Sequence, residues 1–239
     1  MVADSTTTIT KPRPTGARER SAKLTTVVDH IADTIKDGVR LGRYVPGQRL
    51  IESDFLSETG FSRGPLREAL RRLEADGVVL LEKNRGAVVR RYSRDEIRNL
   101  YEVRELLETH AARLAARRVV DDDAAATRIE GSRRRMRRTL VKDAIAEYTR
   151  ENTRFHVLVA ETSGNPWLER IIETLQLPVD RLAVLHLVTL GASKSSLSEH
   201  EEIIDAILAG DAARAEKAMR VHLRNSRKMV ESLPERAFR

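Results

Sequence analysis

The stretch GFSRGPLREALRRLEADG, residues 60–77, combines regularly spaced leucines with an unusual number of arginines. At 100° per residue, its apolar side chains fall on one stripe of a helix. These side chains are Leu66, Ala69, Leu70 and Leu73. The flank beside the stripe carries Arg63, Arg67 and Arg71. The pattern therefore predicts an amphipathic helix with one face in a core and another face suited to an anion.

The residues on either side predict two more helices and a hairpin. Apolar residues recur at helical spacing from Leu24 to Ile35, and a short helix is expected around residues 53–59, closed by Gly60. Ser62 can cap the arginine-rich helix and Pro65 is tolerated in its first turn. VVLLEKNRGAVVRR then reads as two β-rich runs around a turn. This order is typical of a winged helix-turn-helix domain.

The third helix of such a domain enters the major groove of DNA through its N-terminal residues. Arg63 and Arg67 are thus candidates for guanine edges or flanking phosphates, and Arg71 for phosphates or solvent. Other expected members of the DNA surface are Ser62, Lys83, Arg85 and Gly86. Residues 1–92 carry 17 basic and 12 acidic side chains, which favours a polyanionic partner. The alternative is a surface helix with solvated arginines.

The overall composition limits the classes of protein further. The chain has 239 residues, of which 41% are apolar, enough for a sizeable core. The absence of cysteine excludes disulfides, thiolate metal sites and cysteine nucleophiles. The longest apolar stretch, Leu182 to Leu190, is too short for a membrane span, and the N-terminus lacks a signal pattern. We therefore expect a cytoplasmic protein with no membrane partner.

The chain from Ser93 onward is predicted to be entirely helical. Ser93 and Glu96 have the spacing of a capping box. In the turn SGNP, Asn165 can cap the following helix, which Pro178 should kink. The predicted helices cover residues 94–118, 122–140, 143–162, 166–190, 196–209 and 212–232.

The fold class expected from these patterns is mainly α, with three parts. Residues 1–20 have almost no apolar side chains and are expected to form a flexible arm. Residues 21–92 form the winged helix-turn-helix domain, and residues 93–239 form an all-α helical bundle. Within the bundle, the run RRRMRR at residues 133–138 suggests a second polyanion site or, more simply, a solvated helix face.

Longer motifs resemble a known family. GRYVPGQRL, FSRGPLREALRRLEADGVV and NRGAVV resemble the DNA-binding domain of the GntR superfamily of bacterial transcription regulators. EVRELLE, NTRFHVLVAETSGNPWL, EHEEIIDAILAGD and AMRVHL resemble the all-helical effector domain, called FCD, of the FadR-like branch. The resemblance implies a dimeric, ligand-responsive repressor or activator, with Arg63 and Arg67 matching the base-reading arginines. Gly64 departs from it, since the family often carries threonine there.

Three histidines and an asparagine form a candidate metal site. Asn152 and His156 are four residues apart on one predicted helix, and His200 and His222 lie on two further helices. An imidazole cluster suits zinc, with nickel and manganese as alternatives. Taken singly, each histidine is more often a core or surface residue than a ligand. The resemblance implies metal binding, because these positions match the Asp/Asn, His, His, His set of many members; an asparagine is the weaker ligand.

Arg104, in YEVRELLE, is a polar residue on a helix that otherwise supplies apolar side chains to a core. One interpretation is a salt bridge with Glu108 at i+4. The resemblance implies instead that Arg104 faces a cavity and pairs with the carboxylate of an effector, to which its fork geometry is suited.

The sequence as a whole predicts a ligand-responsive transcription regulator and not an enzyme. We expect a homodimer that binds a near-palindromic double-stranded operator and, through a divalent metal ion, a small carboxylic or sugar acid. One alternative is a metalloenzyme of the helical domain, since three histidines around zinc also describe hydrolytic sites. Against it, Ile204 stands where a zincin motif that starts at His200 needs its second histidine. The other alternative is an effector-independent DNA-binding dimer.

Overall fold

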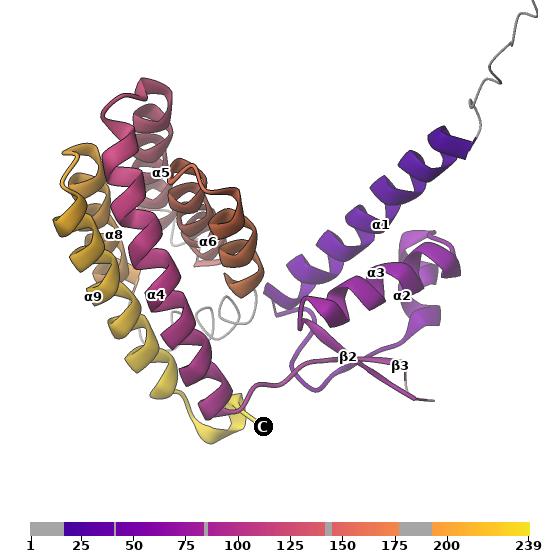
Figure 1. The fold of residues 1–239 in the computed structure, drawn as a ribbon. Helices are drawn as coiled ribbons and strands as arrows, with labels where there is room; N and C mark the ends of the chain where they lie inside the picture. The colour runs from indigo at the N-terminus through magenta and orange to yellow at the C-terminus, as the bar shows by residue number, and fades with distance from the viewer. Residues whose placement is uncertain (1–16, 41, 84–85, 142–144, 177–192) are drawn as a thin grey trace, which may run out of the picture.

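The computed structural model describes residues 17–40, 42–83, 86–141, 145–176 and 193–239. Helices α1 to α3 and a small sheet lie together, and the long helices α4 to α9 form a separate bundle (Figure 1). This arrangement confirms the expected class, a mainly α protein with a winged helix-turn-helix and a helical bundle. The predicted helix 166–190 is helical over 166–176, while its remainder, including Pro178, lies outside the described residues.

The N-terminal domain contains three helices and three short strands. The elements are α1 (Ala17–Arg40), β1 (Arg49–Leu50), α2 (Glu52–Thr59), α3 (Arg63–Ala75), β2 (Val79–Glu82) and β3 (Gly86–Val89). Helix α1 begins inside the segment 1–20 that was expected to be a flexible arm, so that expectation is wrong for residues 17–20. These residues, Ala-Arg-Glu-Arg, have high helix propensity and extend a helix whose later turns are packed.

The core of this domain is built on the leucine stripe of α3. All four stripe residues are buried, and they pack with Val28, Ile31 and Ile35 of α1. Gly60 ends α2 with a φ of 71°, a left-handed conformation that favours glycine and turns the chain sharply into α3. Ser62 occupies the N-cap position of α3, but its side chain makes no capping hydrogen bond, unlike the expectation from sequence.

The strands form an antiparallel sheet in the order β1-β3-β2. The predicted hairpin pairs Val79 with Val89, and β1 adds Arg49 opposite Val88. The sequence did not indicate β1, because two residues carry no readable alternation. Val79 and Val89 are buried and join the sheet to the helical core.

The C-terminal bundle consists of long helices. The elements are α4 (Arg94–Val119), α5 (Asp123–Val141), α6 (Ile145–Thr162), a helical segment over residues 166–176, α8 (Ser193–Leu208), α9 (Ala212–Glu231) and a final 3₁₀ turn, η1 (Glu235–Ala237). Helix α4 packs along α9 and also contacts α6 and α8 (Figure 1). Its buried alanines, among them Ala112 and Ala115, allow this close approach. None of the described helices is long and apolar enough to cross a bilayer.

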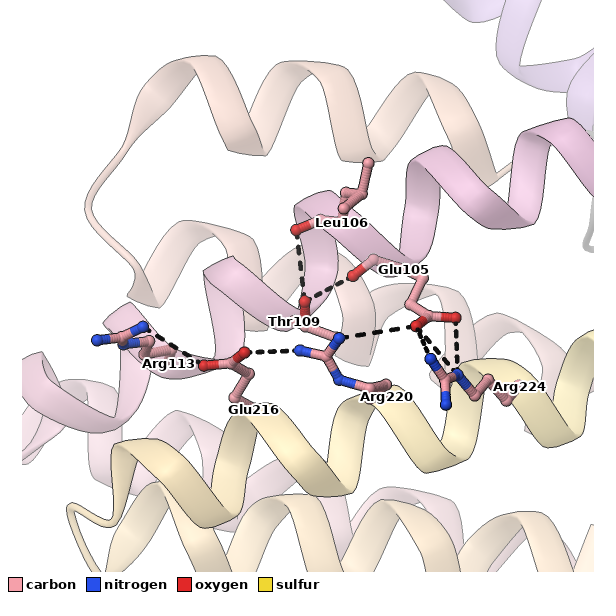
Figure 2. Close-up of polar contacts among 7 residues, drawn as sticks. All are labelled: Glu105, Leu106, Thr109, Arg113, Glu216, Arg220 and Arg224. Atoms are coloured by element: carbon pink, nitrogen blue, oxygen red, sulfur yellow. Dashed lines mark hydrogen bonds and ion pairs between the residues drawn. The ribbon is translucent and has the colours of Figure 1, made fainter.

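Ion pairs join α4 to α9 on the outside of the bundle (Figure 2). Arg224 of α9 donates to Glu105 of α4, with 2.8 Å between Nη2 and Oε1. Arg220 lies 3.8 Å from the same carboxylate and donates to Glu216 at 2.6 Å. Glu216 in turn lies 3.6 Å from Arg113 of α4. The network holds the register of the two helices that carry Arg104 and His222.

The junction between the two domains is tied on both sides. The Tyr92 hydroxyl donates to the Gly77 carbonyl of the N-terminal domain at 2.6 Å. Arg94 donates to the Leu233 carbonyl at 2.7 Å, and its guanidinium lies 4.2 Å from the centre of the Phe238 ring. The start of α4 is thus fixed between the winged domain and the C-terminal segment.

The capping box at the start of α4 gives the first prediction. The Ser93 hydroxyl accepts from the Glu96 amide, and the Glu96 carboxylate accepts from the Ser93 amide at 2.8 Å. Ser93→Ala should therefore lower the free energy of unfolding by about 1 kcal/mol in urea denaturation. Ser62→Ala is the matched control, because the Ser62 side chain makes no capping bond; it should change stability by less than about 0.5 kcal/mol. Equal losses for both would contradict the capping assignment.

Candidate metal centre and DNA-binding surface

Helix α3 presents its basic side chains away from the core. Its leucine stripe faces α1, and Arg63, Arg67 and Arg71 are exposed on the flank beside it. Ser62, just before the helix, is also exposed. The N-terminal end of α3 therefore carries two exposed hydrogen-bonding side chains, Ser62 and Arg63.

The ion pairs of these arginines are weak and easily exchanged. Arg67 Nε lies 3.4 Å from Glu52 Oε2, and Arg71 Nη1 lies 3.3 Å from Glu68 Oε2. Such exposed pairs contribute about 0–1 kcal/mol, so a phosphate or a base edge can replace the carboxylate at small cost. Arg63 has no ion-pair partner among the described residues. All three guanidinium groups are thus accessible to an incoming polyanion.

The hairpin supplies the other part of the expected DNA surface. Lys83, at the end of β2, is exposed. Gly86 begins β3 with a φ of 77°, in the left-handed region that favours glycine. Arg85 lies outside the described residues, so its expected contact stays a prediction.

Three buried histidines converge where α6, α8 and α9 meet. They are His156, His200 and His222, each at most 2% exposed. One ring nitrogen of each lies within 4.8 Å of those of the other two. The ring centroids of His200 and His222 are 4.3 Å apart, and those of His156 and His222 are 5.2 Å apart. The fold thus brings together the three histidines that the sequence singled out.

Two of the histidines are oriented by carboxylates. His156 Nδ1 lies 2.5 Å from Glu108 Oε2, and His222 Nδ1 lies 2.9 Å from Glu199 Oε2. With Nδ1 facing a carboxylate, Nε2 of each ring carries the lone pair available to a ligand. A carboxylate behind a ligating imidazole is the usual arrangement around protein-bound metal ions. The sequence indicated Glu108 only as a salt-bridge partner of Arg104 and did not indicate Glu199, although Glu199 directly precedes His200.

His200 provides the sharpest test of whether a metal ion fits. Its Nδ1 lies 3.4 Å from the Tyr148 hydroxyl, and it also interacts with the Ser196 backbone. Its Nε2 is buried and has no hydrogen-bond partner in the described part of the chain. A buried polar atom without a partner is rare and costly in proteins. A cation bound at Nε2 would satisfy this atom, so the residues present fit a metal ion.

The protonation states also suit a metal ion. Burial lowers the pKa of His200 well below its ordinary value, and the neighbouring His222 and His156 lower it further. Burial likewise lowers the pKa of His222, although Glu199 partly opposes this. Both rings are therefore neutral imidazoles, the form that binds metals. Burial alone would raise the pKa of Glu108, but the charge of Arg104 and the contact with His156 lower it to about 2.

The other two predicted site residues stand in different positions. Asn152 lies one turn before His156 on α6 and is partly exposed; its role as a ligand stays a prediction. Arg104 is 3% exposed and donates to Glu108 Oε1 at 2.6 Å, the salt bridge considered as the alternative to effector binding. It also donates to Gln176 Oε1 at 3.1 Å. An effector that binds Arg104 must therefore compete with partners already in place.

A winged helix-turn-helix joined to a helical bundle with a buried polar centre defines a class of protein, the two-domain DNA-binding regulators. Residues 27–89 match the family described as bacterial regulatory proteins, gntR family, and residues 99–225 match the FCD domain. The chain belongs to the GntR family of transcription regulators, in the group that carries an FCD domain.

Individual relatives agree with this assignment. The chain is 28% identical over 208 residues to the HTH-type transcriptional regulator LutR of Bacillus subtilis (strain 168), covering 78% of this chain and 93% of LutR. It is 24% identical over 188 residues to the HTH-type transcriptional repressor RspR of Escherichia coli (strain K12), covering 79% and 82%. The solved structure of E. coli McbR/YncC superimposes with a TM-score of 0.77 at 17% identity, covering 85% of this chain and 96% of that one, which shows a shared fold.

The buried histidines predict a pH-dependent stability. The pKa values of His200 and His222 in the folded state lie below the ordinary value of 6.5, so the unfolded chain takes up protons first as the pH falls. The stabilisation is present above that value and is lost as the pH falls below it. In metal-free protein, His200 and His222 should each cost up to about 1.4 kcal/mol at one pH unit below 6.5.

Urea denaturation with a chelator, at about pH 7.5 and about pH 5.5, measures this loss. The double variant His200→Gln/His222→Gln should lose much less stability over the same range. A loss in the variant as large as that in the wild type would show that other groups cause the pH dependence.

Proposed function

We propose that the helical domain of this regulator holds a divalent metal ion at His156, His200 and His222, with Asn152 as a fourth ligand. The observation that carries the proposal is the buried Nε2 of His200, which has no hydrogen-bond partner among the described residues. Zinc is the ion we favour, with nickel and manganese as alternatives: imidazole suits the first two ions and an amide oxygen suits the third. The naming of the relatives as transcriptional regulators supports a regulatory, non-catalytic role for this centre.

The proposed effector is a small carboxylic or sugar acid. When bound, the ion would supply a Lewis acid that attracts the carboxylate. Arg104 is the proposed second contact, because its guanidinium fork matches a carboxylate. Since Arg104 now donates to Glu108 and Gln176, the acid would exchange with the Gln176 amide and loosen the helical segment 166–176 from α4. The acid shifts a conformational equilibrium only by its difference in affinity, typically about 1–3 kcal/mol.

The proposed DNA contacts divide by role. Arg63 and Arg67, at the N-terminal end of α3, would read guanine edges or bind flanking phosphates. Arg85 would reach a minor groove or the backbone. The other residues, Ser62, Arg71, Lys83 and Gly86, would contact the sugar-phosphate backbone. The exposure of the α3 arginines and the weakness of their ion pairs support these roles.

The proposed assembly is a homodimer on a near-palindromic operator in the cytoplasm. A single winged module buries too little surface for tight operator binding, so two copies are needed. The helical bundle over residues 93–239, the larger part of the chain, would carry the dimer contacts. As with RspR, whose name describes a repressor, the proposed sign of regulation is repression.

The DNA contacts can be tested with two variants that should affect specific and random DNA differently. Arg63→Ala should weaken binding to the specific operator by about 1–3 kcal/mol and leave binding to random duplex nearly unchanged. Lys83→Ala should weaken both duplexes alike, because a backbone contact carries no sequence information. Fluorescence anisotropy at one fixed salt concentration measures both, and the wild-type titration should give two chains per operator. Equal losses on both duplexes for Arg63→Ala would refute base reading.

The metal centre can be tested with His200→Ala and the matched control His110→Ala, an exposed histidine on α4. His200→Ala should remove bound metal, measured by mass spectrometry of purified protein, and should abolish the change in operator affinity across a panel of hydroxy and sugar acids. Binding to DNA without effector should persist, because no proposed ligand lies in residues 21–92. The control should keep both metal and response. A His200→Ala protein with stoichiometric metal and a normal response would overturn the assignment.

A further inference from the structure

Residues of α5 and α6 line an open pocket that has no part in the proposed metal centre. It has a volume of about 290 Å³. Its lining residues are Arg135, Arg138, Thr139, Glu147, Arg150, Glu151 and Arg154. Arg135 and Arg138 belong to the run RRRMRR, which the sequence left open between a polyanion site and a solvated helix face. The packing of α5 on α6 brings that run opposite two further arginines.

The pocket contains more guanidinium groups than its carboxylates can compensate. Glu151 accepts from Arg135 at 2.7 Å and from Arg154 at 2.6 Å, so one carboxylate already serves two arginines. Arg138 and Arg150 have no ion-pair partner among the described residues. The pocket also holds the exposed carboxylate of Glu147, so four arginines meet two carboxylates, and within the described structure Arg138 and Arg150 remain without an ion pair.

A second observation at Arg150 also favours anion binding. Its Nε atom is buried and makes no hydrogen bond in the described part of the chain. Other buried side-chain atoms share this property, including Arg133 Nε and Arg227 Nε, but neither of these residues lines this pocket. A buried N–H without an acceptor costs free energy that a bound anion would recover. At Arg150 the unused donor belongs to a residue that lines the pocket, which favours an anion there.

We infer that the α5–α6 pocket binds the phosphate group of a small anionic metabolite. A guanidinium offers two parallel N–H donors, a geometry that matches phosphate oxygens, and the three arginines Arg138, Arg150 and Arg154 approach from two helices. The pocket adjoins a larger one that shares Arg135, Arg150 and Arg154 and is also lined by Arg40 of α1. The site is independent of the metal centre, so either can fail without the other.

Inorganic phosphate is the probe, titrated into full-length protein by calorimetry at low ionic strength. Arg150→Gln and Arg138→Gln should each weaken phosphate binding by at least about tenfold, because each removes a charge-assisted donor. Arg150→Lys, which keeps the charge and loses the fork, should give an intermediate loss. The matched control is Arg134→Gln, an exposed arginine of the same run that does not line the pocket; it should change the affinity by less than about twofold.

Two further measurements separate this site from other roles. Phosphate binding should persist in His200→Ala, since the proposed pocket shares no residue with the histidine cluster. Arg150→Gln should not lower the thermal midpoint of the phosphate-free protein, and phosphate should raise the midpoint of the wild type much more than that of Arg150→Gln.

Four results would overturn the inference. The first is absence of phosphate binding to the wild type at millimolar concentration, and the second is an equal loss in Arg134→Gln. The third is loss of binding in His200→Ala, which would move the phosphate to the metal ion. The fourth is a combined result with random duplex DNA: Arg150→Gln binds the duplex more weakly than the wild type, and phosphate does not compete with the duplex for the wild type. That result would make the α5–α6 pocket a DNA contact.

Discussion

The buried carboxylate of Glu108 is the constraint on which the bundle depends. A charge at 1% exposure is tolerated only when it is paired and hydrogen-bonded, and Glu108 achieves this by accepting from Arg104 on one oxygen and lying against His156 with the other. Removing one partner of such a pair generally costs about 3–5 kcal/mol. The charge of Arg104, the orientation of His156 and the position of α4 are therefore parts of one electrostatic arrangement.

Helix α4 connects this arrangement to the winged domain. It carries Arg104 and Glu108 along its middle, begins at the capping box of Ser93, and is held to α9 by the ion pairs of Glu105. Tyr92 and Arg94 tie its first turn to the N-terminal domain and to the C-terminal segment. A shift of α4 along its axis would move the junction between the two domains directly, because α4 begins at that junction. Packed helices transmit such shifts because close packing allows them few stable positions relative to one another.

The sequence correctly predicted the helix faces and helix ends that depend on hydrophobic periodicity and on capping residues. The leucine stripe fixed the buried face of α3, and Ser93 with Glu96 fixed the start of α4. The capping side chain of Asn165 was also predicted correctly, since its Oδ1 accepts from the amide of Trp167 at 3.0 Å. Contacts between helices were harder, because helix rotation and tilt follow from packing. The i+4 spacing predicted the salt bridge between Arg104 and Glu108. It gave no sign that Glu108 would also contact His156, or that Gln176 would reach Arg104. The absence of a capping hydrogen bond from the Ser62 side chain could not be predicted either. The rotamer of that side chain depends on neighbouring residues that the sequence motif does not include.

The helical segment 166–176 carries a natural fluorescent probe. Trp167, at one end of this segment, is 71% exposed and is the single tryptophan of the chain, while Gln176, at the other end, donates to Glu108 and accepts from Arg104. Tryptophan emission from this protein therefore comes from one surface position, with no second indole to dilute the signal. Its wavelength and quenching respond to the solvent around that ring. Intrinsic fluorescence thus gives a label-free view of the helix that touches the buried arginine, in the unmodified protein.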